Sequence, residues 1–193
     1  MKKLFVLVLT TGVFFTASAQ IQFGVKAGVN IATLAGAGSA GATSKVGFHG
    51  GGFARIPLVN SFFLQPELVY SGQGAKATSD GVVYNINQNY LNIPVLAKWE
   101  HSSGFYRETG PQLGFLLAAN VSAGGSSQDV KSSYKSTDFS WAFGVGYKLP
   151  LISAGINARY NLGISNIAAD QVNGYAVRNS VFQLGVFYMF GGK

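Results

Sequence analysis

Apolar residues alternate with small or polar residues along almost the whole chain after residue 20. The period is two residues, as in a strand whose successive side chains point to opposite faces, and differs from the 3.6-residue period of an amphipathic helix. Residues 138–149 show it most clearly, with Phe139, Trp141 and Phe143 on one face and Ser140 on the other. This alternation predicts an all-β fold.

Eight segments carry the alternation, and each is about ten residues long. They cover residues 23–31, 46–56, 62–71, 89–100, 106–119, 138–149, 152–163 and 180–190. That length is nearly twice the usual length of a globular strand and matches a tilted strand that crosses a bilayer. The segments therefore predict a closed antiparallel eight-stranded transmembrane β-barrel.

The connections between these segments alternate in length. The long ones hold 14, 17, 18 and 16 residues and cover residues 32–45, 72–88, 120–137 and 164–179. The short ones are residues 57–61, residues 101–104 and a turn around Pro150. Outer-membrane barrels combine long extracellular loops with short periplasmic turns, so we expect four displayed loops and both chain ends in the periplasm.

Charged residues within the strands are expected to point into the barrel. A Lys or Arg that faced lipid at the middle of the bilayer would cost about 2–4 kcal/mol. An eight-stranded bore is just wide enough for side chains to fill. We expect an interior charge network of Lys26, Arg55, Glu67, Lys98, Glu100 and Arg159. This network would act either as a fixed plug or as a narrow ion path.

Aromatic residues lie mostly toward the ends of the predicted strands, where they would form girdles at the two membrane interfaces. The candidates are Tyr70, Tyr90, Trp99, Trp141, Tyr147, Tyr160, Tyr188 and Phe190. Ordinary strand propensity is the alternative explanation for these aromatics.

The first 19 residues have the features of an export signal. Two lysines precede an almost continuous apolar run from Leu4 to Phe15, and Ala17-Ser18-Ala19 fits a small-residue cleavage site. We expect cleavage between Ala19 and Gln20, which leaves residues 20–193 as the barrel domain. A buried helix or an uncleaved anchor is the alternative, but the run is shorter than the roughly 20 residues of a membrane span.

The composition excludes several other classes of protein. Charged residues are 11% of the chain, and aromatics are 13%, which excludes an intrinsically disordered chain. The net charge of +7 is scattered without a basic cluster, so we expect no nucleic-acid partner. The chain has no cysteine, two histidines and no nucleotide-binding glycine motif, so we expect neither a metal nor a cofactor.

Two further alternatives concern function and environment. Glu100, His101 and Ser102 are the residue types of a nucleophilic triad, but neighbours in a strand point to opposite faces, so we expect no catalytic residue and no enzyme. The second histidine, His49, lies in a glycine-rich strand. A soluble lipocalin-like barrel would turn the apolar rows inward, but the small residues opposite Trp141 would make a poor solvent face.

Five segments carry a resemblance to a known family: Leu64–Ser71, Tyr90–Lys98, Gly110–Leu117, Ala158–Gly163 and Arg178–Phe190. Together they resemble the outer-membrane β-barrel proteins common in Bacteroidota, often labelled porin family or PorT-like. The resemblance implies an OmpA/OmpX-like eight-stranded barrel in the outer membrane. It implies contact with outer-membrane lipid and with the barrel-assembly machinery during insertion.

The resemblance is specific for the barrel and assigns no activity, because fold does not fix function. We therefore expect a structural or interaction scaffold that meets extracellular or envelope protein partners through its loops. The alternative is a narrow passive channel for small solutes or ions, which the many glycines and the surplus of inward cations would favour.

Overall fold

The computed structural model describes residues 20–36, 41–79, 81–169 and 176–191. Its strands are β1 (Gln22–Ala35), β2 (Lys45–Val59), β3 (Phe62–Ser79), β4 (Val82–Glu100), β5 (Phe105–Ala123), β6 (Ser126–Asp129), β7 (Thr137–Lys148), β8 (Ala154–Gly163) and β9 (Arg178–Phe190). A short 3-10 helix, η2 (Lys131–Ser133), precedes β7. The expected signal peptide, with Ala19 at its end, lies outside the described residues.

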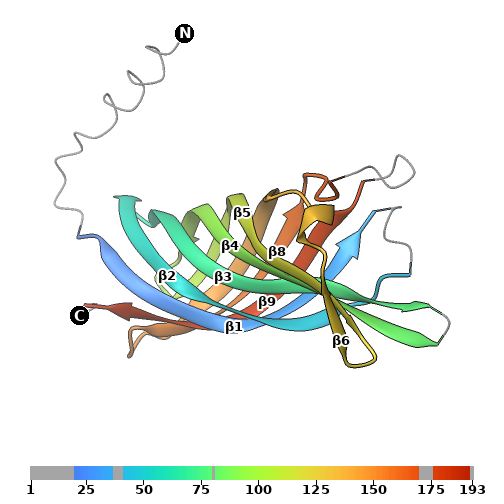
Figure 1. Ribbon diagram of the computed structural model, residues 1–193. Coiled ribbons are helices and arrows are strands. Elements are labelled where there is room, and N and C mark those ends of the chain that lie inside the picture. The colour runs from blue at the N-terminus through green and yellow to red at the C-terminus, as the bar shows by residue number, and fades with distance from the viewer. Residues whose placement is uncertain (1–19, 37–40, 80, 170–175, 192–193) are drawn as a thin grey trace, which may run out of the picture.

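Eight of these strands close into a ring (Figure 1). Each pairs antiparallel with its neighbours in the order β1-β2-β3-β4-β5-β7-β8-β9, and β9 returns to pair with β1. Strand β6 stands outside the ring and pairs with β5. The predicted closed antiparallel eight-stranded barrel is confirmed. Within the described ranges, no helix is long and apolar enough to cross a membrane.

The two ends of the barrel differ. One end carries the first and last described residues and the three short connections after β2, β4 and β7, and we call it the turn end. The other end, which we call the loop end, carries the connections after β1, β3, β5 and β8. In Figure 1 the turn end lies at the left, beside the C-terminus.

The outer wall is apolar and the interior is polar. Phe48 is 72% exposed on the outer wall, while Asn30 and Gln88 inside the ring are fully buried. This is the reverse of a soluble barrel, in which the apolar rows would fill the interior. An apolar outer wall of this kind is stable in contact with lipid. Because the ring is closed, no unpaired backbone edge is exposed to the hydrocarbon.

Three aromatic side chains that point into the barrel each pack over a glycine on the neighbouring strand. The directly opposed pairs are Phe53 with Gly24, Tyr106 with Gly146, and Phe187 with Gly155. A Cβ atom added at these glycines would lie 2.3, 2.4 and 2.4 Å from the opposing ring. At these three positions inward glycine therefore makes room for aromatic side chains in a narrow bore.

The expected loop 72–88 is almost entirely β-structure and half of the expected loop 120–137 is, so the expectation of a loop was wrong for these residues. Strands β3 and β4 continue to Ser79 and Val82, across most of the expected loop 72–88. Strand β5 continues to Ala123 and forms a hairpin with β6 within the expected loop 120–137. Gly124 and Gly125 join them with φ angles of 55° and 85°, as a type I′ hairpin turn requires.

These extensions make the barrel wall uneven. Strands β3, β4 and β5 hold 18, 19 and 19 residues, whereas β8 holds 10. The extra residues form what we call the protruding sheet: residues 72–79 of β3, 82–88 of β4, 118–123 of β5, and β6. Figure 1 shows its two hairpins reaching past the other strands at the loop end.

Candidate functional site

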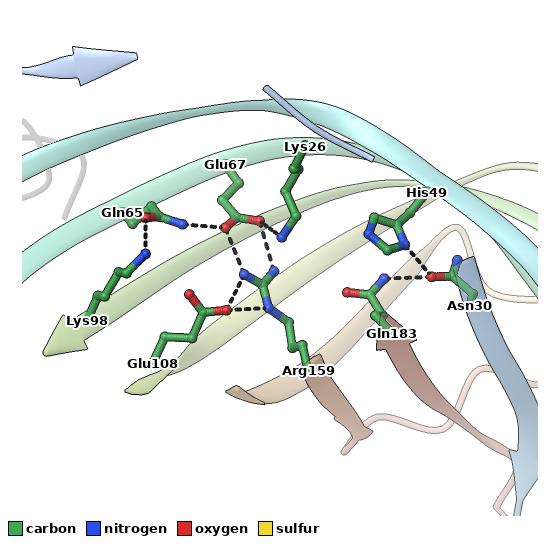
Figure 2. Close-up of polar contacts among 9 residues, drawn as sticks. All are labelled: Lys26, Asn30, His49, Gln65, Glu67, Lys98, Glu108, Arg159 and Gln183. Carbon is green, nitrogen blue, oxygen red and sulfur yellow. Dashed lines mark hydrogen bonds and ion pairs between the residues drawn. The ribbon is translucent and has the colours of Figure 1, made fainter. Parts of the chain in front are cut away.

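The middle of the barrel interior is occupied by four charged side chains from four strands, which we call the central cluster (Figure 2). Arg159 of β8 donates to both oxygens of Glu67 of β3, at 2.8 Å each. The same guanidinium donates to Glu108 of β5 at 2.6 and 2.9 Å. Lys26 of β1 completes the cluster with an ion pair of 3.2 Å to Glu67.

The central cluster is electrically balanced and buried. It joins two cations to two carboxylates, and each of these residues is at most 6% exposed. A buried ion pair offsets its desolvation cost only when its geometry is good and its remaining hydrogen bonds are satisfied. The two-pronged contacts of Arg159 meet that condition, so the cluster fixes β1, β3, β5 and β8 across the bore.

Lys98 lies beside the central cluster without forming an ion pair among the described residues. Its ammonium donates to Gln65 at 3.5 Å, and Gln65 in turn donates to Glu67 at 2.8 Å. The ammonium also lies 3.4 Å from the centre of the Tyr106 ring. A cation over an aromatic face is stabilised by the ring quadrupole, which compensates for the missing carboxylate.

Arg55 and Glu100 form a separate group at the turn end. Their side chains pair at 2.9 Å, and Lys148 approaches Glu100 at 3.8 Å. The Arg55 guanidinium lies 3.6 Å from the centre of the Phe63 ring. The single six-residue network expected from the sequence is therefore divided into a central cluster, Lys98, and this pair.

The two histidines lie in different parts of the barrel and have different hydrogen-bond partners. His49, opposite Gly28, is buried on the loop-end side of the central cluster, and its Nδ1 donates at 2.8 Å to the Asn30 oxygen, which also accepts from Gln183 at 2.9 Å. His101 lies in an exposed turn, where its Nδ1 contacts the Ser103 hydroxyl at 2.9 Å. Within the described part of the chain, no group of three or more His, Asp or Glu side chains could hold a metal ion.

Apolar layers lie on both sides of the polar interior. Toward the turn end, Phe53, Tyr106, Phe187 and Met189 form a buried layer. Toward the loop end, buried apolar residues of β1, β3 and the segment before β9 form another layer: Leu34, Ala75, Ile167, Ala168 and Val177. A cavity of about 10 Å³ remains beside the central cluster, between Arg159 and Tyr106. One water molecule needs about that much space, so side chains fill this part of the bore.

The interior network expected from the sequence left out two residues that belong to it, Glu108 and Gln65. Glu108 is the most important, because it is the second carboxylate of Arg159. It lies on the same face of its strand as buried Gln112, opposite the outward Leu113 and Phe115. Gln65 shares its parity with Glu67 in the same way. The alternation of inward and outward side chains along each strand is therefore enough to place both residues inside the barrel.

Seven of the eight predicted interfacial aromatics lie on the outer wall, at least partly exposed. Trp99, Tyr147, Tyr188 and Phe190 lie toward the turn end, and Tyr70, Trp141 and Tyr160 lie farther along their strands. The prediction that Tyr90 is an interfacial aromatic was wrong. It is fully buried and packs with Leu116 and Ala119 inside the barrel. Its parity matches that of inward Asn92, so it cannot join an outer girdle.

A closed antiparallel ring with an apolar outer wall and a polar, charged interior defines an outer-membrane β-barrel. A family model described as "Outer membrane protein beta-barrel domain" matches residues 16–169. The chain belongs to this family, as the resemblance in its sequence indicated, and the outer membrane is its location.

Solved structures share the fold at low sequence identity. Neisserial surface protein A (NspA) aligns with a TM-score of 0.57 and 19% identity, over 87% of this chain and 97% of its own. Ail, the attachment invasion locus protein of Yersinia pestis, aligns in complex with the heparin analogue sucrose octasulfate with a TM-score of 0.50 and 16% identity, over 88% of this chain and 99% of its own. No curated protein sequence matches the chain.

Proposed function

We propose that this protein is a non-conducting outer-membrane scaffold that meets extracellular or envelope proteins through its protruding sheet. In this proposal residues 1–19 are a cleaved signal peptide, Gln20 is the first mature residue, and the barrel-assembly machinery inserts the chain with its turn end in the periplasm. The barrel carries no catalytic role.

One observation carries the proposal: seven of the eight ring strands exceed the length that a bilayer needs, and β3, β4 and β5 exceed it most. A tilted strand crosses the membrane in 9–11 residues, and β3, β4 and β5 hold 18, 19 and 19. At the tip of the β3–β4 hairpin, Val82, Val83 and Tyr84 are between 37% and 48% exposed. Loops and hairpins on a rigid scaffold carry binding more often than the scaffold does.

The features that would favour a narrow channel have another explanation in this geometry. The inward glycines considered above are covered by aromatic rings, so they do not widen the bore. The cation surplus is smaller than the sequence indicated, because Glu108 balances Arg159 in the central cluster. Both observations support the scaffold over the channel.

The proposal is tested by photo-crosslinking on intact cells of the native bacterium. We expect a photoreactive amino acid at Tyr84 or at Gln128 to give discrete protein adducts, because both positions are exposed on the protruding sheet. The same amino acid at Phe143, which is 51% exposed on the outer wall, is the matched control and should give lipid adducts only.

Absence of protein adducts from both hairpin positions, in cells where the protein is folded and abundant, would contradict the scaffold. Adducts that appear equally from Phe143 would mean that the protein meets partners through its wall and not through the protruding sheet. Heat-modifiable gel migration checks that each variant is folded.

A further inference from the structure

Arg107 is a charged residue on the outer wall of the barrel. Its side chain is exposed, and it lies on the same face of β5 as outward Phe105 and Leu113. The other charged side chains in the turn-end halves of the described ring strands lie on the inward faces of those strands. A charge that faces lipid is costly at the middle of the bilayer and is tolerated near its interfaces. Arg107 is the third residue of β5 from the turn end, so it lies near an interface.

The Arg107 guanidinium lies against an aromatic ring and has no anionic partner within the described part of the chain. Its central carbon is 4.9 Å from the centre of the Trp99 ring, and the two residues are directly opposed on β5 and β4. None of the ion pairs among the described residues involves Arg107. An indole ring orients a guanidinium without neutralising its charge. An anion at this interface would supply the missing partner.

An apolar groove of about 560 Å³ crosses the outer wall from Arg107. It lies between two rows of side chains that are directly opposed from strand to strand. One row runs from Arg107 on β5 to Ala158 on β8, and the next runs from Thr109 on β5 to Phe182 on β9. The small side chain of Ala158 lines the groove together with larger apolar side chains. The charge of Arg107 therefore stands at one end of an apolar channel in the wall.

The groove rises from the interface into the apolar band. Counted from the turn end, Arg107 is the third residue of β5, Ala158 the fifth of β8 and Phe182 the ninth of β9. At about 3.3 Å per residue and a tilt of about 40°, Phe182 lies roughly 15 Å deeper in the membrane than Arg107. This is the depth of one leaflet, since the hydrocarbon core is about 30 Å thick. A lipid whose headgroup meets Arg107 can therefore lay an acyl chain along the groove.

We propose that Arg107 and this groove bind one phospholipid of the periplasmic leaflet. The guanidinium donates charge-assisted hydrogen bonds to the phosphate, for which its planar fork is well suited, and the groove holds an acyl chain. The site thus combines a polar contact with a shaped apolar surface. This inference uses the orientation given under Proposed function, with the turn end in the periplasm, and is independent of any protein partner.

The test measures binding of phosphatidylglycerol to the protein in detergent micelles by native mass spectrometry. We expect Arg107→Gln to bind it at least about tenfold more weakly, as the loss of one charge-assisted contact predicts. Arg107→Lys, which keeps the charge, should bind more tightly than Arg107→Gln. Arg178→Gln removes an exposed arginine at the loop end and is the matched control, with unchanged affinity. Diacylglycerol, which lacks the phosphate, should bind wild type and Arg107→Gln equally.

A second pair of variants tests the groove. Ala158→Phe should weaken phosphatidylglycerol binding at least about fourfold, which corresponds to one buried methylene, because the added ring occupies the groove. Ala27→Phe makes the same change on β1, outside this groove, and should leave the affinity unchanged. Equal binding by wild type and by folded Arg107→Gln would overturn the inference, and so would equal losses from Ala158→Phe and Ala27→Phe.

Crosslinking in intact cells tests which leaflet supplies the lipid. A photoreactive amino acid at Val145, which is opposite Arg107 and lines the groove, should give phospholipid adducts. Lipid A adducts from this position would overturn the assignment to the periplasmic leaflet. Photo-crosslinking from Tyr84 tests the scaffold separately, so the two proposals can fail independently.

Discussion

Arg159→Met should lower the free energy of unfolding in lipid vesicles by about 3–5 kcal/mol, as expected when one partner of a buried ion pair is removed. Arg159 is 2% exposed and joins Glu67 to Glu108. Without it, Glu67 keeps Lys26 as its cation, and Glu108 loses the one ion-pair partner it has among the described residues. Urea titration followed by the fluorescence of Trp99 and Trp141 measures the loss.

Two further variants make this expectation specific. Arg178→Met removes an exposed arginine at the start of β9 and should change the stability by less than about 0.5 kcal/mol. Adding Glu108→Gln to Arg159→Met should recover about 1–3 kcal/mol, because it removes an unpaired buried charge. If Arg159→Met alone unfolds like wild type, or if the double variant is less stable than the single one, the central cluster does not hold the barrel together.

Gly146→Val should cost about 3 kcal/mol, at the upper end of what overpacking a core costs. A Cβ atom at this position would lie 2.4 Å from the ring of Tyr106 and 2.5 Å from the carbonyl oxygen of Ile156. The ring cannot move away freely, because Phe187 lies 6.0 Å from it, centre to centre, and the Lys98 ammonium lies over its face. The same urea titration measures the loss.

Gly50→Val is the matched control. It makes the same substitution on β2, where an added Cβ would meet no atom closer than 3.7 Å. Gly50 shares its parity with outward Phe48, and valine favours strands, so we expect no loss of stability. Equal losses of stability from Gly50→Val and Gly146→Val would contradict this expectation. They would mean that the backbone conformation requires glycine at both positions and that the interior is not tightly filled.

Most of the barrel could be predicted from the sequence, because its wall repeats one simple physical rule. Lipid outside and a narrow polar bore inside force strict alternation, so eight strands and their inward charges follow from parity. Lys26, Glu67 and Arg159 are inward and meet each other. Which inward charges meet depends on register and shear across non-adjacent strands. Local alternation therefore could not separate Arg55 and Glu100 from the central cluster.

The loop end was predicted less well, for two physical reasons. Outside the bilayer a strand does not need apolar outward residues, so the β3–β4 extension has polar strand residues such as Asn85 and Asn87 that resemble a loop. The sequence nevertheless has Asp-Gly at residues 80–81 and Gly-Gly at residues 124–125, both common hairpin signals. Tyr90 was misplaced because residue type was given more weight than its parity.

The measurement that tests the central claim most directly is single-channel conductance of the protein purified from outer membranes and inserted into a planar bilayer. Heat-modifiable migration first shows that the protein is folded, and a 16-stranded porin is the positive control for the bilayer. The filled interior predicts no conductance steps above background. Steady steps that change with Arg159→Met or Glu67→Gln would contradict the account, because ions would then pass through the central cluster.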